Sequence, residues 1–409
     1  MKYRHIPVAL LTLSATAADY THYSSVQRIL ESDAPQLADE SKWNVWAREH
    51  DRTIRARLEQ GGLDSMVNLL LFGTSFTKQP RIRIENIAKA TQSGILRART
   101  LDLLQGIRSP GRNERLGFVR GLLSSKSLDP DAPDAGVFIL QNLERVLREL
   151  REFGRRPDRF TVFHDRGVSL DTSILPSFGI EAALRDLKER GGLAPGGVRR
   201  AAVIGPGLDF TDWDSGYDFY PPQTLQPFAL YQSLSRLGFL TSTTTITVFD
   251  ISPRVLDHLK RARARARTGE DYVVQLPRDP ASNWLPEVME YWQGFGSPAT
   301  PIKPPALLSA LETRAARFQP EVVLTCDPAD LNIVVQRDTT AQFDLIVGTN
   351  VLVYYEALEQ ALAVANIASM LKPGGVFLSN TEVPGGRRLG WTAVRYTPDA
   401  GDRVVWYGK

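Results

Sequence analysis

Two glycines at the end of an apolar run are the residues of this chain that could most directly do chemistry. The run Ala201 to Ile204 is short and apolar, as in a buried strand, and Gly205 and Gly207 follow at once around Pro206. Glycine has no Cβ, so the main chain can adopt unusual dihedral angles there and lie directly against a ligand. The pattern predicts a ligand-binding turn at the carboxyl end of a parallel strand.

The spacing after this turn separates two classes of nucleotide cofactor. A dinucleotide fingerprint has a third glycine three residues after the second, which lets the next helix pack closely with its N-terminus toward a pyrophosphate. Position 210 is Phe, so that fingerprint is absent. Taken alone, the turn could equally be an ordinary tight turn without a ligand, so the later segments have to decide.

Three later segments place polar residues at the ends of expected strands. Thr245 to Asp250 is a β-branched run that ends in a carboxylate, and Ser252-Pro253 begins a helix directly after it. Glu321 to Asp330 is expected to be another strand that ends in an acid. The segments 343–350 and 370–378 then predict a strand, followed by a helix end, a glycine turn and one more strand.

In this order, the segments resemble the motifs of class I S-adenosylmethionine (SAM)-dependent methyltransferases, and Gly205-Pro206-Gly207 resembles the first of them. The resemblance implies a seven-stranded, doubly wound, Rossmann-like α/β sheet with SAM as the cofactor. It implies that Asp250 accepts hydrogen bonds from the ribose hydroxyls, that Asp327 binds the adenine amino group, and that Leu331 packs on the adenine ring. The implied cofactor-binding residues are Gly205, Pro206, Gly207, Asp209, Asp250, Ile251, Asp327, Asp330, Leu331 and Asn350.

Three positions depart from the family pattern. Many members have an acid two residues before the first glycine, which holds the cofactor's amino group, and here Val203 stands there. Asp209 replaces the third glycine, and it could take over that contact or serve the substrate. Related methyltransferases that act on nucleic-acid bases have a Pro-Pro-aromatic sequence after an Asn or Asp. That sequence does not follow Asn350, which argues against methylation of nucleic-acid bases.

The expected reaction requires little covalent chemistry from the protein itself. Methyl transfer from a sulfonium is an in-line displacement, so the protein mainly aligns donor and acceptor and excludes water. A general base is needed only if the reacting acceptor atom carries a proton. The candidates are His164, Asp209, Asp212, Tyr354 and Tyr355, although His164 could also be an ordinary loop histidine.

Composition excludes several other classes of protein. The chain has 409 residues and a net charge of +3, which gives no global argument for nucleic-acid or membrane binding. The single cysteine, Cys326, excludes an intramolecular disulfide and a thiolate cluster, and it is expected to be a small core residue. The five histidines lack ligand spacing, so no metal is expected. The preferred acceptor is a small molecule.

Two folded parts are expected. Residues 20–155 read as a helical N-terminal domain, in which Ser41 caps a helix that ends at Gly61-Gly62. Basic residues dominate between Arg81 and Arg120; they could form a patch for an acidic substrate or RNA, but we favour a solvated helix face. Residues 156–409 form the methyltransferase domain, with aromatic-rich insertions at about 211–220 and 268–318.

Both insertions are candidates for the substrate wall. The first could bind a flat or cationic acceptor, or it could be a lid that only shields the cofactor from water. The second is expected to be rich in loops and to contribute to specificity.

The N-terminus leaves the compartment open. Lys2 and Arg4 precede a short apolar run, and Ala15-Thr16-Ala17 has the spacing of a signal-peptidase site, so residues 1–17 are a possible secretory signal peptide. The cofactor's availability instead favours the cytoplasm, and the run is too short to span a bilayer. Two rival functions follow: a non-catalytic scaffold with the methyltransferase fold, supported by Val203 and possible export, and an NAD(P)-dependent oxidoreductase, which Phe210 disfavours.

Overall fold

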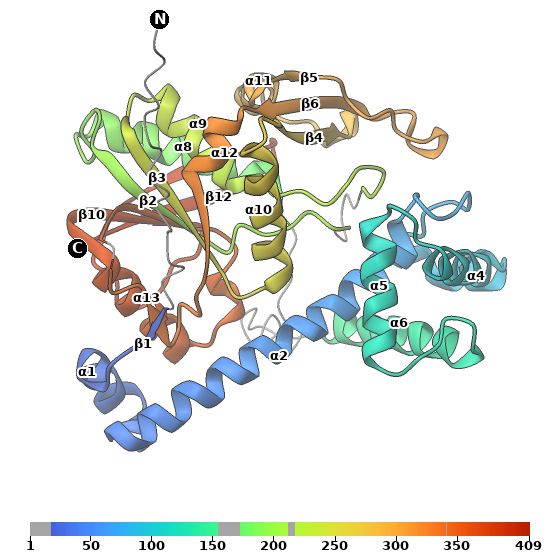
Figure 1. The fold of residues 1–409 in the computed structure, drawn as a ribbon, viewed down its shortest axis with the longest axis horizontal. Helices are drawn as coiled ribbons and strands as arrows, with labels where there is room; N and C mark the ends of the chain where they lie inside the picture. The colour runs from blue at the N-terminus through green and yellow to red at the C-terminus, as the bar shows by residue number, and fades with distance from the viewer. Residues whose placement is uncertain (1–17, 154–171, 212–216, 341) are drawn as a thin grey trace, which may run out of the picture.

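The computed structural model describes residues 18–153, 172–211, 217–340 and 342–409, and a seven-stranded sheet lies at its centre (Figure 1). The strand order is β11-β12-β10-β9-β2-β3-β7. The first two strands of that order are antiparallel to their neighbours and the other five are parallel to one another. This confirms the doubly wound, Rossmann-like sheet. The strands are β2 (Val198–Ile204), β3 (Leu240–Asp250), β7 (Cys326–Asp330), β9 (Phe343–Gly348), β10 (Leu371–Ser379), β11 (Arg388–Arg395) and β12 (Gly401–Gly408).

Helices cover both faces of the sheet because its strands alternate two sets of apolar side chains. Ala201 and Val203 of β2 pack with α8 (Ile174–Glu189), α9 (Gln226–Arg236) and α10 (Pro253–Ala266). Ala202 and Ile204 face the other way, toward α13 (Ala357–Met370), α1 (Tyr23–Asp33) and the first half of α2. A two-residue strand, β1 (Asp19–Tyr20), pairs with β8 (Gln336–Arg337) on this side.

Helix α2 (Glu40–Phe72) is one continuous helix of 33 residues, so the predicted end at Gly61-Gly62 is wrong. Both glycines are buried inside it, and a Cβ on Gly62 would lie 3.1 Å from the ring of Phe118. The glycines therefore admit a neighbouring helix instead of ending their own. The predicted cap at Ser41 is also wrong, because Asp39 caps the helix and accepts from the main-chain N–H groups of Ser41 and Lys42.

The second half of α2 packs with the helices that follow it, and we call residues 63–153 the helical unit. It contains α3 (Ile87–Gln92), α4 (Ile95–Arg108), α5 (Glu114–Ser125) and α6 (Pro133–Phe153) around one apolar core. Figure 1 shows α2 running from the sheet to these helices. Arg99 and Arg115 are fully buried here, so the solvated helix face expected for this basic segment is wrong for these two residues.

The insertion at 268–318 is a small sheet and not the loop-rich segment expected. Strands β4 (Tyr272–Arg278) and β5 (Ser297–Ala299) both pair antiparallel with β6 (Glu312–Phe318). The helix α11 (Pro286–Gly294) lies between β4 and β5 in the chain. Its Tyr291 and Trp292 belong to the core that covers the main sheet, so the insertion is anchored to the domain that carries it.

The segment expected as one strand over 321–330 is divided. Residues Pro320–Thr325 form the short helix α12, and β7 begins only at Cys326. Cys326 is buried, as expected of a small core residue. Asp327 is the second residue of this strand, three residues before its carboxyl end, and Asp330 ends the strand opposite Asp250 of β3.

Candidate active site

The glycine turn follows β2, where the sequence predicts it. Gly205 and Gly207 have φ angles of 62° and 72°, in the left-handed region that favours glycine. A Cβ on Gly205 would come within 2.4 Å of the Val351 side chain. The Gly205 N–H donates to the carbonyl of Phe249 in β3 at 2.8 Å. Glycine is thus required at 205 by both conformation and space, and the turn is tied to the neighbouring strand.

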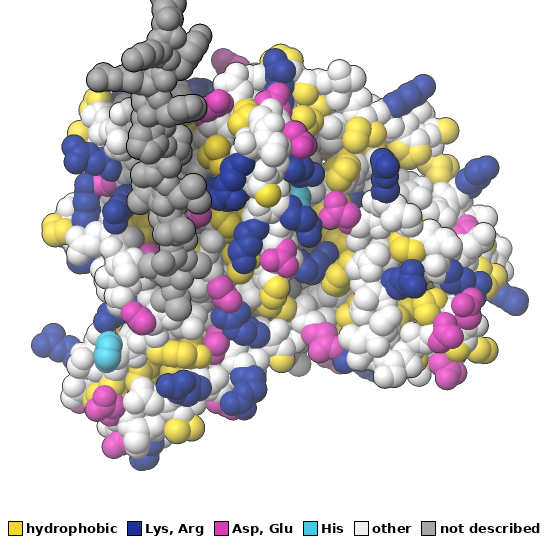
Figure 2. All heavy atoms as spheres, viewed as in Figure 1, with side chains coloured by type: hydrophobic (Ala, Val, Ile, Leu, Met, Phe, Trp, Pro, Cys, Tyr) yellow, Lys and Arg dark blue, Asp and Glu magenta, His cyan; other side chains and the backbone are white. Residues whose placement is uncertain are grey.

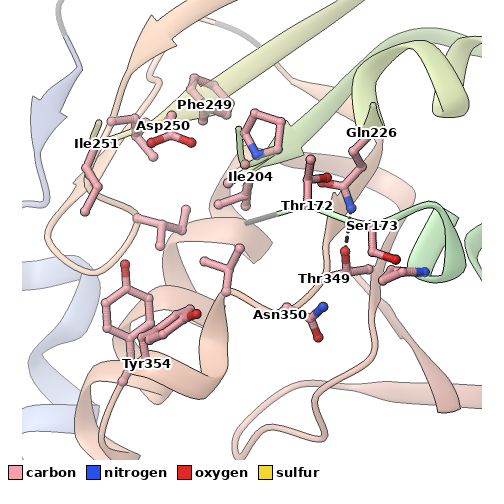
Figure 3. A pocket seen from close by; sticks show the side chains of 18 residues that line it. Thr172, Ser173, Ile204, Gln226, Phe249, Asp250, Ile251, Thr349, Asn350 and Tyr354 are labelled. Atoms are coloured by element: carbon pink, nitrogen blue, oxygen red, sulfur yellow. Dashed lines mark hydrogen bonds between the residues drawn. The ribbon is translucent and has the colours of Figure 1, made fainter. Parts of the chain in front are cut away.

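A pocket opens at the carboxyl ends of β2, β3 and β9, beside this turn (Figure 3). It encloses about 790 Å³ between protein atoms, including the part open to solvent. Figure 3 shows Asp250 and Ile251 on one side of the pocket and Gln226, Thr349 and Asn350 on another. Of the predicted cofactor residues, it is lined by Gly205, Pro206, Gly207, Asp250, Ile251, Leu331 and Asn350.

Asp250 is the ionisable side chain that the pocket holds at the end of β3. It is only 7% exposed, and its Oδ1 accepts from the main-chain N–H of Ser252 at 2.7 Å. Burial raises the pKa of Asp250 to about 7, with a further contribution from the charge of Asp330, while main-chain N–H groups act in the opposite direction. A ligand that donates hydrogen bonds to this carboxylate would favour its ionised form.

Asn350 and its neighbour are held by polar side chains that sequence reasoning missed. Asn350 donates its main-chain N–H to Asn380 Oδ1 at 2.8 Å, and Asn380 Nδ2 donates back to Asn350 Oδ1 at 2.7 Å. Gln226 Nε2 donates to Thr349 Oγ1 at 2.5 Å, as Figure 3 shows. These partners are distant in the sequence, so no local pattern could have identified them.

Tyr354 and Tyr355 both line the pocket, as the candidate catalytic residues should. They lie at the end of the short 3-10 helix η5 (Leu352–Tyr354) before α13. Burial raises the pKa of Tyr355, so its hydroxyl keeps its proton near neutral pH and is poorly suited to be a general base. Of the three other candidates for a general base, Asp209 does not line this pocket, and His164 and Asp212 lie outside the described residues.

Asp327 and Asp330 are not among the residues that line this pocket. Asp327, which the resemblance places at the adenine, forms an ion pair with Arg263 of α10 at 3.3 Å. Asp330 receives Arg55 of α2 on both carboxylate oxygens, at 2.8 and 3.2 Å. Arg55 also donates to the carbonyl of Ile251 at 3.3 Å, and Arg57 donates to that of Tyr354 at 2.9 Å. Helix α2 therefore contacts the rim of the pocket, a role that its sequence pattern does not reveal.

Asp209 lines a second, larger hollow, which we call the cleft. The cleft encloses about 2410 Å³, including space open to solvent, and it shares Thr172 and Ser173 with the first pocket. The helical unit, the loop after the glycine turn and the small β4–β6–β5 sheet all contribute to its walls. Its aromatic lining residues are Phe72, Tyr217, Tyr220, Trp284 and Trp292.

Comparisons with solved structures return partial similarities to methyltransferases. The N-methyltransferase NodS from Bradyrhizobium japonicum WM9 is 15% identical over 56% of this chain and 94% of that one, with a TM-score of 0.29. A TehB-like SAM-dependent methyltransferase from Corynebacterium glutamicum is 12% identical over 65% of this chain and 97% of that one, with a TM-score of 0.26. The glycopeptide N-methyltransferase MtfA, in complex with SAM, is 12% identical over 56% of this chain and 76% of that one, with a TM-score of 0.24.

These similarities are distant, and the order and directions of the strands in the central sheet define the fold. No family profile matches the chain, and no curated protein matches it. Within the described ranges, no helix is both long and apolar enough to cross a membrane. The same ranges contain no group of three or more His, Cys, Asp or Glu side chains that could hold a metal ion.

Proposed function

We propose that this protein is a SAM-dependent methyltransferase that transfers a methyl group in line to a small-molecule acceptor. One observation carries the proposal: a glycine turn and a buried carboxylate, Asp250, face the same pocket at the ends of two adjacent parallel strands. A cofactor that has a ribose and no phosphate fits this pair, because the turn offers close main-chain approach and the carboxylate offers acceptors for hydroxyl groups.

The lining residues divide into three roles under this proposal. Asp250 would accept hydrogen bonds from the ribose hydroxyls, and Ile251 and Leu331 would provide apolar contact for the adenine. Gly205 to Gly207 would lie against the amino-acid part, near Asn350. When bound, SAM supplies an electrophilic methyl group on a sulfonium. The protein's own contribution is to hold this donor at a fixed place and exclude water, so that an acceptor can approach in line.

The cleft would bind the acceptor substrate, and it meets the cofactor pocket at Thr172 and Ser173. Its concave shape and aromatic lining suit a small molecule. On the face shown in Figure 2, Lys and Arg side chains are interspersed with Asp and Glu and do not gather in one basic patch. That distribution supports a small acceptor over a nucleic acid.

Two structural details bear on the rival functions. Phe210 is fully buried against Phe118, so no close helix approach of the dinucleotide type follows the turn. Val203 is also fully buried in the sheet core, and an apolar side chain suits that position.

Calorimetric titration with SAM, with its demethylated product S-adenosylhomocysteine, and with NAD⁺ tests the proposal. We expect SAM and the product to bind with a Kd on the order of micromolar and NAD⁺ not to bind. Asp250→Ala should abolish SAM binding. Its matched control is Asp327→Ala, another β-strand carboxylate, which should bind SAM like the wild type.

The possible outcomes separate the rivals. Heat with NAD⁺ but not with SAM would favour the oxidoreductase. A folded protein that binds none of the three compounds would favour the scaffold. Undiminished SAM binding by Asp250→Ala would remove the ribose assignment, and lost binding by Asp327→Ala would restore the adenine contact predicted from the sequence.

A further inference from the structure

Gln275 of β4 lies deep in the cleft and is tied to the segment that follows the glycine turn. It lines the cleft and is only 7% exposed. Its main-chain N–H donates to Gln223 Oε1, and its carbonyl accepts from Gln223 Nε2, both at 2.7 Å. The carbonyl of Gln223 in turn accepts the main-chain N–H of Asp209 at 2.7 Å, and Asp209 follows Gly207 by two residues. These bonds fix Gln275 relative to the turn.

The side-chain amide of Gln275 is held in one orientation. Its Oε1 accepts from the main-chain N–H of Ile302 at 2.9 Å. An amide nitrogen cannot accept that bond, so turning the amide over would break it. In the described part of the chain, Nε2 has no hydrogen-bond partner, and it is not enclosed by protein atoms either. The amide therefore offers its N–H donors to the open space of the cleft that Gln275 lines.

Aromatic side chains accompany this amide in the cleft. Trp284 and Trp292 both line it. Trp292 Nε1 already donates to the carbonyl of Leu276, the next residue of β4, at 3.2 Å, so Trp292 offers a ligand its ring and not a donor. A buried donor is unfavourable unless it meets an acceptor. Since the described residues supply no acceptor to Nε2 of Gln275, its partner is a ligand or water.

We propose that the acceptor substrate has an aromatic body with a carbonyl oxygen, and that Gln275 donates a hydrogen bond to this oxygen. The inference rests on the proposed methyltransferase function. The aromatic side chains give the body of the acceptor apolar contact, and the fixed amide supplies the polar contact that orients it. Gln275 thus binds the acceptor and holds it relative to the cofactor turn, and it takes no part in the methyl transfer itself.

The fixed amide also determines which groups of a ligand are disfavoured at this position. A group that has only N–H donors would meet the N–H donors of Gln275 Nε2, and the donors on both sides would lack a partner. Water, by contrast, would satisfy Nε2 without any such selection. Selection between a carbonyl group and an N–H group therefore distinguishes a ligand site from a hydrated amide.

Two uncharged probes with one phenyl ring test this inference: acetophenone, which has a carbonyl oxygen and no polar hydrogen, and aniline, which has N–H donors. They are titrated into the full chain saturated with S-adenosylhomocysteine, and binding is followed by ligand-observed NMR. The readout is the ratio of the two dissociation constants in each variant relative to the wild type, because this comparison cancels the general difference in apolarity between the probes. Gln275→Glu keeps an oxygen for the N–H of Ile302 but removes the donors, so it should shift the ratio about tenfold in favour of aniline.

Gln275→Met removes the donors without adding a charge, and it should weaken acetophenone binding about fivefold while aniline binding stays within about twofold of the wild type. Gln293→Glu is the matched control, because it makes the same change at an exposed position of α11 that does not line the cleft. It should leave the ratio unchanged. An unchanged ratio in a folded Gln275 variant, or an equal shift in Gln293→Glu, would overturn the inference. So would the lack of acetophenone binding to the wild type up to about 50 mM, a range in which ligands this small are expected to bind.

The cofactor step separates this inference from the function on which it rests. If the wild type does not bind S-adenosylhomocysteine, the methyltransferase proposal itself fails. If the wild type binds it and neither Gln275 variant does, Gln275 serves the cofactor site or the fold, and the inference about the acceptor is overturned. If at least one variant binds it like the wild type, that variant is folded and its probe ratio decides.

Discussion

Asp218, in the loop beyond the glycine turn, accepts two hydrogen bonds from Thr74 at the end of α2, from its main-chain N–H at 2.7 Å and from its hydroxyl at 2.9 Å. The other carboxylate oxygen accepts the main-chain N–H of Ser75 at 2.9 Å and its hydroxyl at 2.5 Å. One buried carboxylate thus joins the helical unit to the loop that carries Tyr217 and Tyr220. The helical unit and this loop each form a wall of the cleft.

Asp218→Asn should loosen this connection without disturbing the cofactor pocket. An amide cannot accept on both sides, and bonds to a charged group contribute about 1.5–3 kcal/mol each, so we expect a loss of stability of about 2 kcal/mol. Urea unfolding measures this loss, and calorimetry should show unchanged SAM binding. Asp131→Asn, at an exposed ion pair with Arg108, is the control and should change stability little. Equal stability of the two variants would contradict the prediction.

Arg115→Met should be more damaging. The Arg115 guanidinium is buried and donates to five loop carbonyls, those of Asp209, Phe210, Tyr217, Asp218 and Tyr220. Methionine fills similar space but leaves buried acceptors without donors, so we expect a loss of roughly 3 kcal/mol or more. Arg120→Met, at an exposed position of the same helix, should be nearly neutral. Thermal unfolding compares the two, and similar melting temperatures would refute the role of Arg115.

Gly205→Ala should impair both folding and cofactor binding. Alanine in the left-handed region loses about 1–2 kcal/mol, and the new methyl group would collide with Val351. We expect reduced stability and SAM binding at least tenfold weaker, measured by calorimetry. Gly121→Ala is the opposite case, because no atom lies near its added Cβ and it sits inside α5. That variant should gain about 0.5–1 kcal/mol. Wild-type SAM affinity in Gly205→Ala would contradict the tight approach at the turn.

The raised pKa of Asp250 predicts two pH effects. Its folded pKa, about 7, lies above the ordinary value of 3.8, so between these values the folded protein holds a proton that the unfolded chain releases. The contribution of Asp250 to stability is therefore present at low pH and is lost as the pH rises toward 7. Urea unfolding from pH 5 to pH 8 should show this decline in the wild type and a smaller decline in Asp250→Asn.

The second effect concerns ligand binding. Ribose hydroxyls favour the ionised carboxylate, so below about pH 7 SAM binding should release a proton. Calorimetry in two buffers of different ionisation enthalpy detects that release. If SAM binding releases no proton, the ligand does not donate hydrogen bonds to Asp250.

Local patterns were sufficient to predict the parts of the fold that depend on neighbouring residues. The apolar run before Gly205, the acid that ends β3 and the helix that begins at Pro253 lie as predicted, because each is fixed within a few residues. The sequence therefore predicted the sheet and the glycine turn, and seven of the ten residues expected at the cofactor line the pocket beside that turn.

Features that depend on distant contacts were not predictable. Gly61 and Gly62 read as a helix end, but both are buried inside α2, and Gly62 packs against the Phe118 ring from α5. The first half of the strand predicted over 321–330 is instead the short helix α12. Predicting the cleft would have required knowing that β4 pairs with β6 and where the helical unit lies. Neither feature has a signal in the local sequence.

Helix α2 also fixes the spacing between the cofactor pocket and the cleft. At the middle of the helix, Arg55 contacts the rim of the cofactor pocket, and at its C-terminal end Phe72 lines the cleft. Each residue of an α-helix adds about 1.5 Å of length and about 100° of rotation, so these two residues are fixed relative to each other in rotation as well as in distance. A single residue inserted between them would turn the whole helical unit away from the loop it holds, although no side chain of either pocket would have changed.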